Sequence, residues 1–260
     1  MNSRISLLAL GVGAYLAFAV ASFPASIAHR WFAPDELALA SVEGTVWRGS
    51  AAYGGINGIA FSNLNWVLHP VALLTGGVNV SVRTDFAGGL ARAEVTSRGN
   101  RVVLDDFEAS ANLGRLPLDR LIGNFGLVPL GRVTGTARAS FDRLELVDGW
   151  PVSAAGSVRL TNLAGPPLFT VPGVTTLTLG SFVAQLGPAN DGSGIVAEVI
   201  DEGGPLELAG EVTLSPDRSY RVTSRIKPRA EAHDALVQGL QVLYPANAAG
   251  QHQITIAASL

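Results

Sequence analysis

The sequence predicts a mainly β protein: a single N-terminal transmembrane helix followed by a curved, mostly antiparallel sheet of about a dozen strands with short packing helices. Three observations lead to this fold class. Residues 5–27 form an apolar run without a charged side chain. Beyond it, apolar and polar residues alternate with a period of two, which buries one face of a strand and exposes the other to water. The 30 glycines that punctuate these segments are typical of turns.

The apolar run divides the chain into a stub of residues 1–4, a transmembrane helix of residues 5–27 and a β-rich domain of residues 30–260. At about 1.5 Å per residue, a helix from Ile5 to Phe23 is about 28 Å long, close to the hydrocarbon thickness of a bilayer. Pro24 is a natural stop for this helix because proline lacks a backbone donor and disfavours helix in the residue before it.

A cleavable signal peptide is the alternative to this anchor. Ala19-Val20-Ala21 and Ser26-Ile27-Ala28 both place small residues as a signal cleavage site requires. The apolar run passes through both sites, and Trp31 and Phe32 follow it, in the place of the aromatic residues that anchor a spanning helix at the membrane interface. We therefore expect an uncleaved anchor.

Period-two alternation is clearest near the end of the chain, where residues 206–214 and 219–227 form two predicted strands. Ser215-Pro216-Asp217-Arg218 joins them and has the composition of a hairpin turn, with proline at its second position. The remaining strand candidates are residues 41–48, 51–61, 78–83, 90–97, 101–112, 132–147, 153–161, 174–183, 194–200 and 254–256.

Helical spacing of apolar residues predicts short helices at residues 117–125 and 230–244, and more weakly at residues 67–74. In the second of these, Leu236, Val237, Leu240 and Leu243 form one stripe. Such a stripe indicates core packing, so we expect this helix to close one end of the sheet.

Composition excludes several classes of function. The chain has no cysteine, which excludes thiolate metal clusters, thiol catalysis and disulfides. Its formal net charge is −3 and its arginines are scattered, so it lacks the basic stripe that nucleic-acid binding requires. We expect no nucleic-acid partner.

No catalytic, cofactor-binding or metal-binding residue is predicted, and we expect a protein that is not an enzyme. The four histidines, His29, His69, His233 and His252, lack the spacing of a metal motif. The acidic pairs Asp105-Asp106 and Asp201-Glu202 flank strands, where neighbouring side chains point to opposite faces and cannot share an acid–base site.

Short motifs in the first third of the chain resemble the type II secretion system protein N family. They are Gly44-Thr45-Val46-Trp47-Arg48-Gly49, then Trp66 and Pro70 with the leucine pair Leu73-Leu74. Later segments, around Leu116-Pro117-Leu118 and from residue 236 to 258, fit the same family, although Leu243-Tyr244-Pro245 departs from its pattern. The motif positions Gly44, Thr45, Trp47, Gly49, Trp66 and Pro70 are interpreted as structural, because a tryptophan in an alternating strand usually packs on the sheet or in the core.

This resemblance implies an accessory, single-pass inner-membrane subunit of the Gram-negative type II protein secretion system. The stub would be cytoplasmic and residues 30–260 would form a periplasmic domain that binds other secretion subunits. The resemblance brings with it no enzymatic activity and no cofactor.

An alternative is a lipid-handling protein anchored in the inner membrane, similar in architecture to the AsmA and TamB group. A lipid groove needs strands that are apolar on both faces. Residues 206–214 and 219–227 have charged second faces, whereas residues 153–161, 174–183 and 194–200 are interpreted as apolar or neutral on both. Lipid is the partner in this alternative.

Overall fold

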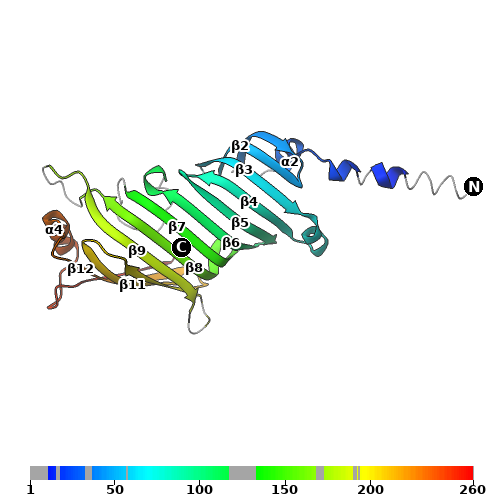
Figure 1. Cartoon of the computed structure of the whole chain (residues 1–260). Helices are drawn as coiled ribbons and strands as arrows, with labels where there is room; N and C mark the ends of the chain where they lie inside the picture. The colour runs from blue at the N-terminus through cyan, green and yellow to red at the C-terminus, as the bar shows by residue number, and fades with distance from the viewer. Residues whose placement is uncertain are drawn as a thin grey trace, which may run out of the picture. The chain divides into compact units, whose positions relative to one another are not determined.

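The computed structural model describes residues 11–15, 18–32, 37–56, 58–116, 133–167, 173–189, 192 and 194–259. Thirteen strands follow one another in chain order as a meander, β1 to β13 (Figure 1). Every strand pair whose register is described is antiparallel. The prediction of a mainly antiparallel β fold with about a dozen strands is therefore confirmed. The chain forms two compact units, Met1–Asp85 and Phe86–Leu260.

Unit 1 begins with helical residues 11–15 and 18–21. Within the described ranges, no helix combines the length and the apolar character needed to cross a membrane, so the anchor over residues 5–27 stays a prediction. The elements that follow are α2 (Ala25–Phe32), β1 (Leu37–Gly44), β2 (Arg48–Ile56), β3 (Ile59–His69), the 3₁₀ helix η1 (Pro70–Thr75) and β4 (Val78–Phe86).

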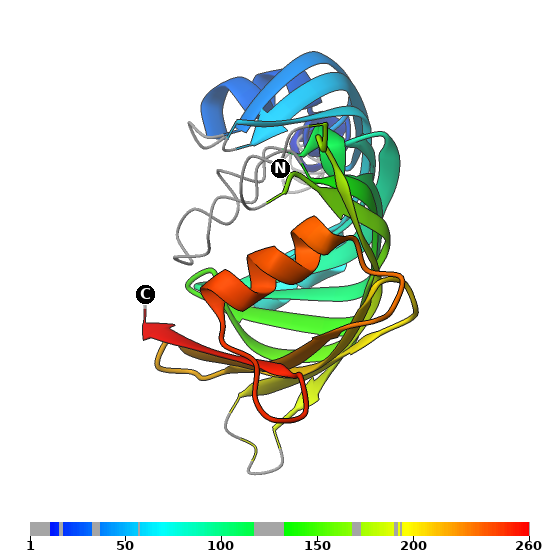
Figure 2. The same cartoon turned by 90° about the vertical axis from the view of Figure 1, so that its left-hand side faces the viewer.

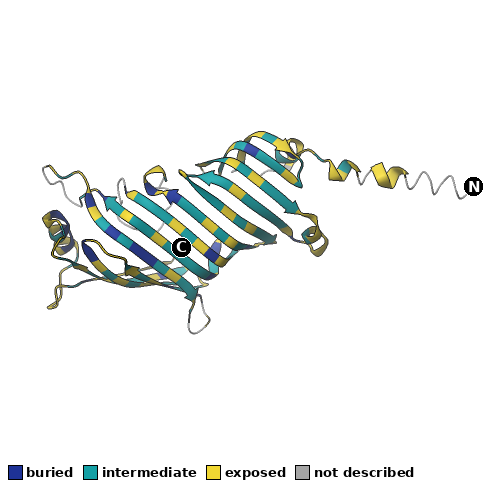
Figure 3. Ribbon diagram, in the orientation of Figure 1, coloured by how far each residue is buried: buried dark blue, intermediate teal, exposed yellow. Residues whose placement is uncertain are grey.

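Unit 2 carries the rest of the meander and the helix α4. Its elements are β5 (Gly89–Arg98), β6 (Arg101–Asn112), the 3₁₀ turn η2 (Leu113–Arg115), β7 (Thr134–Val147), β8 (Trp150–Gly165), β9 (Leu177–Pro188), β10 (Ile195–Asp201), β11 (Leu206–Leu214), β12 (Ser219–Pro228), α4 (Asp234–Leu243) and β13 (His252–Ser259). Along these strands exposed residues alternate with more buried ones (Figure 3), as the period-two pattern predicts.

Strand boundaries differ from the prediction in unit 1. Residues 51–61, predicted as one strand, belong to β2 and β3, and Ile56 pairs with Ile59 across the turn between them. The pair Asn57-Gly58 at this turn is a strong hairpin signal that the period-two pattern alone passes over. Residues 41–48 are likewise divided between β1 and β2 by a turn at residues 45–47.

Of the three predicted helices, one is an α-helix in the structure, one is divided between a strand and a 3₁₀ helix, and one is not described. The predicted helix at residues 230–244 is α4, shorter at both ends. It begins after His233, whose Nδ1 accepts a hydrogen bond from the N–H of Ala235 over 3.1 Å. Of residues 67–74, the first three complete β3 and the others belong to η1. The helix predicted at residues 117–125 lies outside the described residues.

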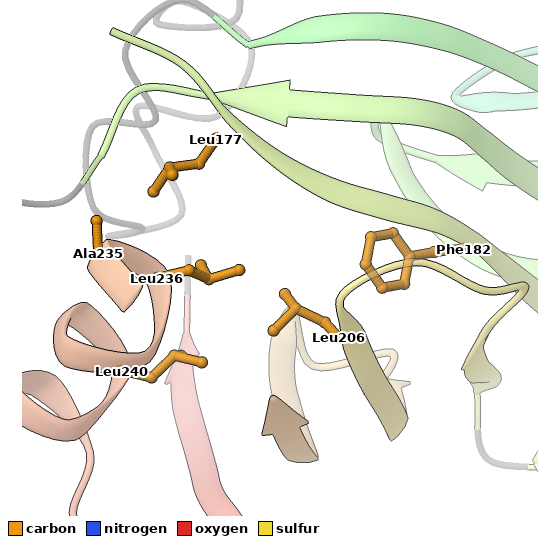
Figure 4. Close-up of a cluster of buried hydrophobic side chains, with 6 residues drawn as sticks. All are labelled: Leu177, Phe182, Leu206, Ala235, Leu236 and Leu240. Carbon is orange, nitrogen blue, oxygen red and sulfur yellow. The ribbon is translucent and has the colours of Figure 1, made fainter. Parts of the chain in front are cut away.

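The core of unit 2 contains a cluster that joins α4 to the sheet. Leu236 and Leu240 of α4 pack with Leu177, Phe182 and Leu206 (Figure 4), while Leu243, predicted to share their stripe, is exposed. Figures 1 and 2 together place α4 at one end of the unit-2 strands. The stripe therefore serves core packing at the end of the sheet, as predicted.

A second cluster lies on the strands themselves. Phe141, Ala154 and Ile195 are buried there, and Phe107 packs against Phe141 with ring centroids 5.8 Å apart. Apolar side chains thus cover one face of the middle strands of unit 2.

Candidate functional site

The motif Gly44-Thr45-Val46-Trp47-Arg48-Gly49 forms the turn between β1 and β2. The N–H of Thr45 donates to the carbonyl oxygen of Arg48 over 2.9 Å, and the N–H of Arg48 donates to Thr45 Oγ1 over 3.2 Å. Gly44 has φ +83°, and a Cβ on it would lie 2.6 Å from the Arg48 carbonyl oxygen. The threonine hydroxyl and the glycine thus fix this turn.

The two motif tryptophans meet at the same turn. Trp66 of β3 lies opposite Gly49 of β2, and a Cβ on Gly49 would lie only 2.3 Å from Trp66 Cζ2. Because that contact is far inside van der Waals distance, the indole of Trp66 requires glycine at position 49. The indole N–H of Trp66 donates to the Val46 carbonyl oxygen over 3.1 Å.

The turn also holds the N-terminal segment. Trp47 Nε1 donates to the carbonyl oxygen of Val20 over 2.8 Å. The N–H of Val46 donates to the carbonyl oxygen of Phe23 over 3.0 Å. Pro24 forms an isolated antiparallel bridge with Thr45. We call the set Val20, Phe23, Val46 and Trp47 the N-terminal clamp. It binds the residues that end the apolar run to the first hairpin of the sheet.

Pro70 lies just beyond the end of β3, two residues after a hydrogen bond that joins β3 to the β1–β2 turn. The N–H of Leu68, near the end of β3, donates to the Trp47 carbonyl oxygen over 2.8 Å. Pro70 then begins η1, where the missing N–H of proline costs no helical hydrogen bond. The structure therefore brings five of the six motif positions to the β1–β2 turn and its β3 partner and puts the sixth just beyond.

The histidines lie in separate surroundings. His69 Nε2 is 2.9 Å from Ser81 Oγ, His233 caps α4, and buried His252 makes a hydrogen bond through Nδ1 with the carbonyl oxygen of Tyr244. In the part of the chain that the structure describes, no three histidine or carboxylate side chains gather in a way that could hold a metal ion.

In each of the acidic pairs Asp105-Asp106 and Asp201-Glu202, the two side chains lie in different surroundings. Asp105 is 3.1 Å from Arg143, while Asp106 is exposed in a bulge with φ +48°. Glu202 pairs with Arg159 over 3.0 Å, and Asp201 pairs with Arg229 over 2.6 Å.

The Asp201–Arg229 pair ties the β10–β11 loop to the end of β12. Arg229 also donates to the carbonyl oxygens of Gly204 and Leu206 over 2.7 and 3.2 Å. Burial by itself raises the pKa of Asp201, but hydrogen bonds donated by Arg229, Leu208 and Gly203 outweigh it and hold this pKa below its ordinary value. Asp105, Asp201 and Glu202 are thus each accounted for by an ion pair. The sequence carries no local signal for this pair, since its partners are 28 residues apart.

The middle strands of unit 2 carry charged side chains where the sequence analysis predicts apolar or neutral ones. Residues 153–161 and 194–200 are predicted to be apolar or neutral on both faces, but Arg159 and Glu198 are exposed on them. A shallow depression over β6, β7 and β8 is lined by Glu108, Arg138 and Arg159 among others. These strands therefore have one apolar and one charged face, which is not the arrangement that the lipid-groove alternative requires.

The edge of the sheet at β13 is suited to binding an extended segment of a partner. Among the described strands, β13 pairs with β12 alone. Its sequence, His252–Ser259, contains no charged residue and no proline, and both are common protections of a natural edge strand. His252 also forms an isolated bridge with Ala246, so an extended partner segment could add to the strand over residues 253–259.

The other edge strand, β1, has such protections. Ser41 has φ +54°, which departs from extended backbone within β1, although the register with β2 is the same on both sides of it. Glu43 adds a charge, and α2 contacts the strand. Since charges and covering elements block edge pairing, β13 is the more accessible edge for a partner.

Comparisons with known proteins bear on the whole chain. A family model described as type II secretion system (T2SS), protein N matches residues 35–255. The type II secretion system protein N of Aeromonas hydrophila is 26% identical over 251 residues, which cover 94% of this chain and 93% of that relative. That of Vibrio cholerae serotype O1 is 28% identical over 237 residues, covering 84% and 86%. No solved structure matches the chain.

The family match includes the β1–β2 turn, both motif tryptophans and nearly all of the sheet. It confirms the resemblance that the motifs indicated. The chain belongs to the type II secretion system protein N family.

Proposed function

We propose that this protein is a non-enzymatic accessory subunit of a type II secretion system, anchored in the inner membrane by residues 5–27. Its β-rich domain, residues 30–260, lies in the periplasm and binds other secretion subunits. Family membership supports the role in secretion, and the unprotected edge of β13 carries the proposal that this role is one of binding.

Binding at β13 occurs by strand addition. A partner segment in extended conformation pairs with the free N–H and C=O groups of β13, and the exposed side chains of Gln253, Thr255 and Ala257 contribute selectivity. Main-chain hydrogen bonds give such an interface affinity, while side-chain contacts determine which partner fits.

Membrane anchoring complements this mode of binding. Confining the domain to the membrane that holds its partners raises their effective concentration, so a modest strand-addition interface suffices. The N-terminal clamp supports this arrangement because it ties the end of the apolar run to the first hairpin through two hydrogen bonds.

The test uses two adjacent proline variants, Thr255→Pro and Ile256→Pro. In an antiparallel strand successive N–H groups point to opposite edges, so one variant removes a donor toward β12 and the other removes a donor on the free edge. The urea unfolding midpoint of each full-length variant identifies which is which. The variant that keeps the wild-type midpoint is the informative one, and the other is its matched control for stability.

Both variants are then expressed in cells with a complete type II system, and tagged protein is isolated after crosslinking. We expect the stable variant to lose the secretion subunits that copurify with the wild-type chain. Undiminished recovery of those subunits would contradict binding at β13. Recovery of phospholipid in near-stoichiometric amount, with no secretion subunit, would instead favour the lipid-handling alternative.

A further inference from the structure

An uncharged stretch of unit 1 contains a short helix with highly exposed apolar residues. Between Arg48 and Arg83 the sequence has no aspartate, glutamate, lysine or arginine. Within this stretch, η1 exposes Val71 at 73% and Leu74 at 87% of their surface, and Leu73 is exposed as well. Three exposed apolar side chains close together on a short uncharged 3₁₀ helix form an apolar patch, and such patches mark contacts with a protein or a membrane.

The helix α2 adds a second set of exposed apolar side chains. Ile27 and Trp31, which are one helical turn apart, are both exposed, Trp31 at 71%. Arg30 between them is exposed too, while Ala25 at the start of the helix is buried. Tryptophan at the polar boundary of the bilayer and arginine reaching its headgroups are typical of segments that lie at a membrane surface.

The N-terminal clamp brings these two sets to the same end of the unit-1 strands. Val46 binds Phe23, two residues before α2 begins, and Trp47 binds Leu68, two residues before η1 begins. Figure 1 shows α2 and η1 at the same end of the strands. We call Ile27, Trp31, Val71, Leu73 and Leu74 the apolar end of unit 1.

We propose that the apolar end of unit 1 contacts the lipid bilayer, with α2 and η1 inserted at the level of the headgroups. The inference rests on the proposed anchor, because residues 5–27 end within this same set of contacts and lead the apolar end to the membrane surface. Lipid fits better than a protein partner because the apolar residues continue a segment that is itself of membrane character. Neither α2 nor η1 carries a carboxylate that an anionic surface would repel.

Contact with lipid at this end also determines which end of the unit-1 strands faces the membrane. The strand β2 leads away from the β1–β2 turn, and eight residues at about 3.3 Å each put Ile56 about 26 Å from Arg48. Ile56 is an exposed apolar residue of the same unit, so it provides a control that differs from the apolar end in position and not in polarity.

The experiment exploits the absence of native cysteine. Single variants Val12→Cys, Ile27→Cys, Leu74→Cys and Ile56→Cys of the full-length chain are labelled with an environment-sensitive fluorophore. Each is reconstituted into vesicles of phosphatidylethanolamine and phosphatidylglycerol, with and without lipids that carry doxyl quenchers both near the headgroup and deep in the acyl chains. The measured quantity is the loss of fluorescence caused by the quencher.

We expect strong quenching at positions 12, 27 and 74 and little at position 56. Quenching at position 12 with positions 27 and 74 resembling position 56 would overturn the inference and leave the anchor intact. Quenching at positions 27 and 74 without quenching at position 12 would support the lipid contact and contradict the anchor. Equal quenching at all four positions would overturn the inference, since it would mean that unit 1 contacts lipid without a preferred end.

Discussion

Trp47, in the turn between the first two strands, donates its indole N–H to the carbonyl oxygen of Val20, 27 residues earlier in the chain. The bond is 2.8 Å long and joins the end of the apolar N-terminal run to the sheet. It explains why a tryptophan stands at this turn, where a smaller residue would suffice to reverse the chain. The link makes the position of the domain depend on the segment that we propose to lie in the membrane.

Replacing this indole with a phenyl ring tests the link. We expect Trp47→Phe to remove the hydrogen bond to Val20 at a cost of about 1 kcal/mol, and so to loosen the N-terminal clamp. Hydrogen exchange of the Val46 amide, which donates to Phe23, is expected to become faster. The control Trp150→Phe removes an indole bond to Ser215 in unit 2, and exchange at Val46 that rose equally in both variants would argue against the clamp.

A glycine pair within β2 tests the contact with Trp66. We expect Gly49→Ala to lower the free energy of unfolding by about 1–3 kcal/mol, because the added methyl group overlaps the indole. At Gly55 in the same strand, the nearest atom to an added Cβ is the Ile59 carbonyl oxygen at 3.6 Å, an ordinary contact. Gly55→Ala is therefore the matched control. Chemical unfolding measures both variants, and an equal loss of unfolding free energy in the two would contradict the close contact of Gly49 with Trp66.

The packing of α4 gives a third prediction. Leu240 is buried against the unit-2 strands and Val242, two residues later, is 68% exposed. We expect Leu240→Ala to cost about 2–5 kcal/mol and Val242→Ala to change stability little. Urea unfolding followed by circular dichroism measures both. Similar midpoints for the two variants would mean that α4 does not pack on the sheet as described.

Asp201 gives a prediction about pH. Its pKa is lower in the folded protein than its ordinary value of 3.8, so the folded state favours the ionised form. The resulting stabilisation is present above that value and is lost as pH falls through the folded-state pKa. We expect Asp201→Asn to lower the free energy of unfolding on the order of 1 kcal/mol at pH 7.

The same variant should differ less and less from the wild type as pH drops below about 3.8, since the carboxyl group takes up its proton first in the unfolded state and then, through the lower folded-state pKa, in the folded state. Unfolding midpoints measured from pH 7 to pH 3 check this trend. A difference between variant and wild type that stayed constant over the whole range would contradict the assigned hydrogen bonds to Asp201.

Much of the fold follows from local pattern. The strands at residues 206–214 and 219–228 and the turn between them agree with the sequence prediction almost residue for residue, because alternation and turn composition are properties of neighbouring residues. The stripe of α4 likewise predicts its buried face. The turn between Ile56 and Ile59 also follows from local chemistry, because the two residues between them are Asn57-Gly58, a strong hairpin signal.

The contacts that define the candidate site could not be predicted in this way. The bond from Trp47 to Val20 and the pair of Asp201 with Arg229 join residues 27 and 28 positions apart. Nothing in the spacing of these residues identifies their partners, since each pairing depends on how strands and turns meet in space. Family resemblance identified Trp47 as a motif residue, but only the fold gives it a physical task.

The free edge of β13 is proposed to bind another type II secretion subunit. The most direct measurement places a photo-activated crosslinking amino acid at Gln253, Thr255 or Ala257 of β13, and at Glu211 of the interior strand β11 as control, in cells with a complete type II system. We predict that the three β13 positions crosslink to the same secretion subunit and that position 211 does not. Absence of any secretion subunit from the β13 adducts, or equal crosslinking from position 211, would contradict the claim.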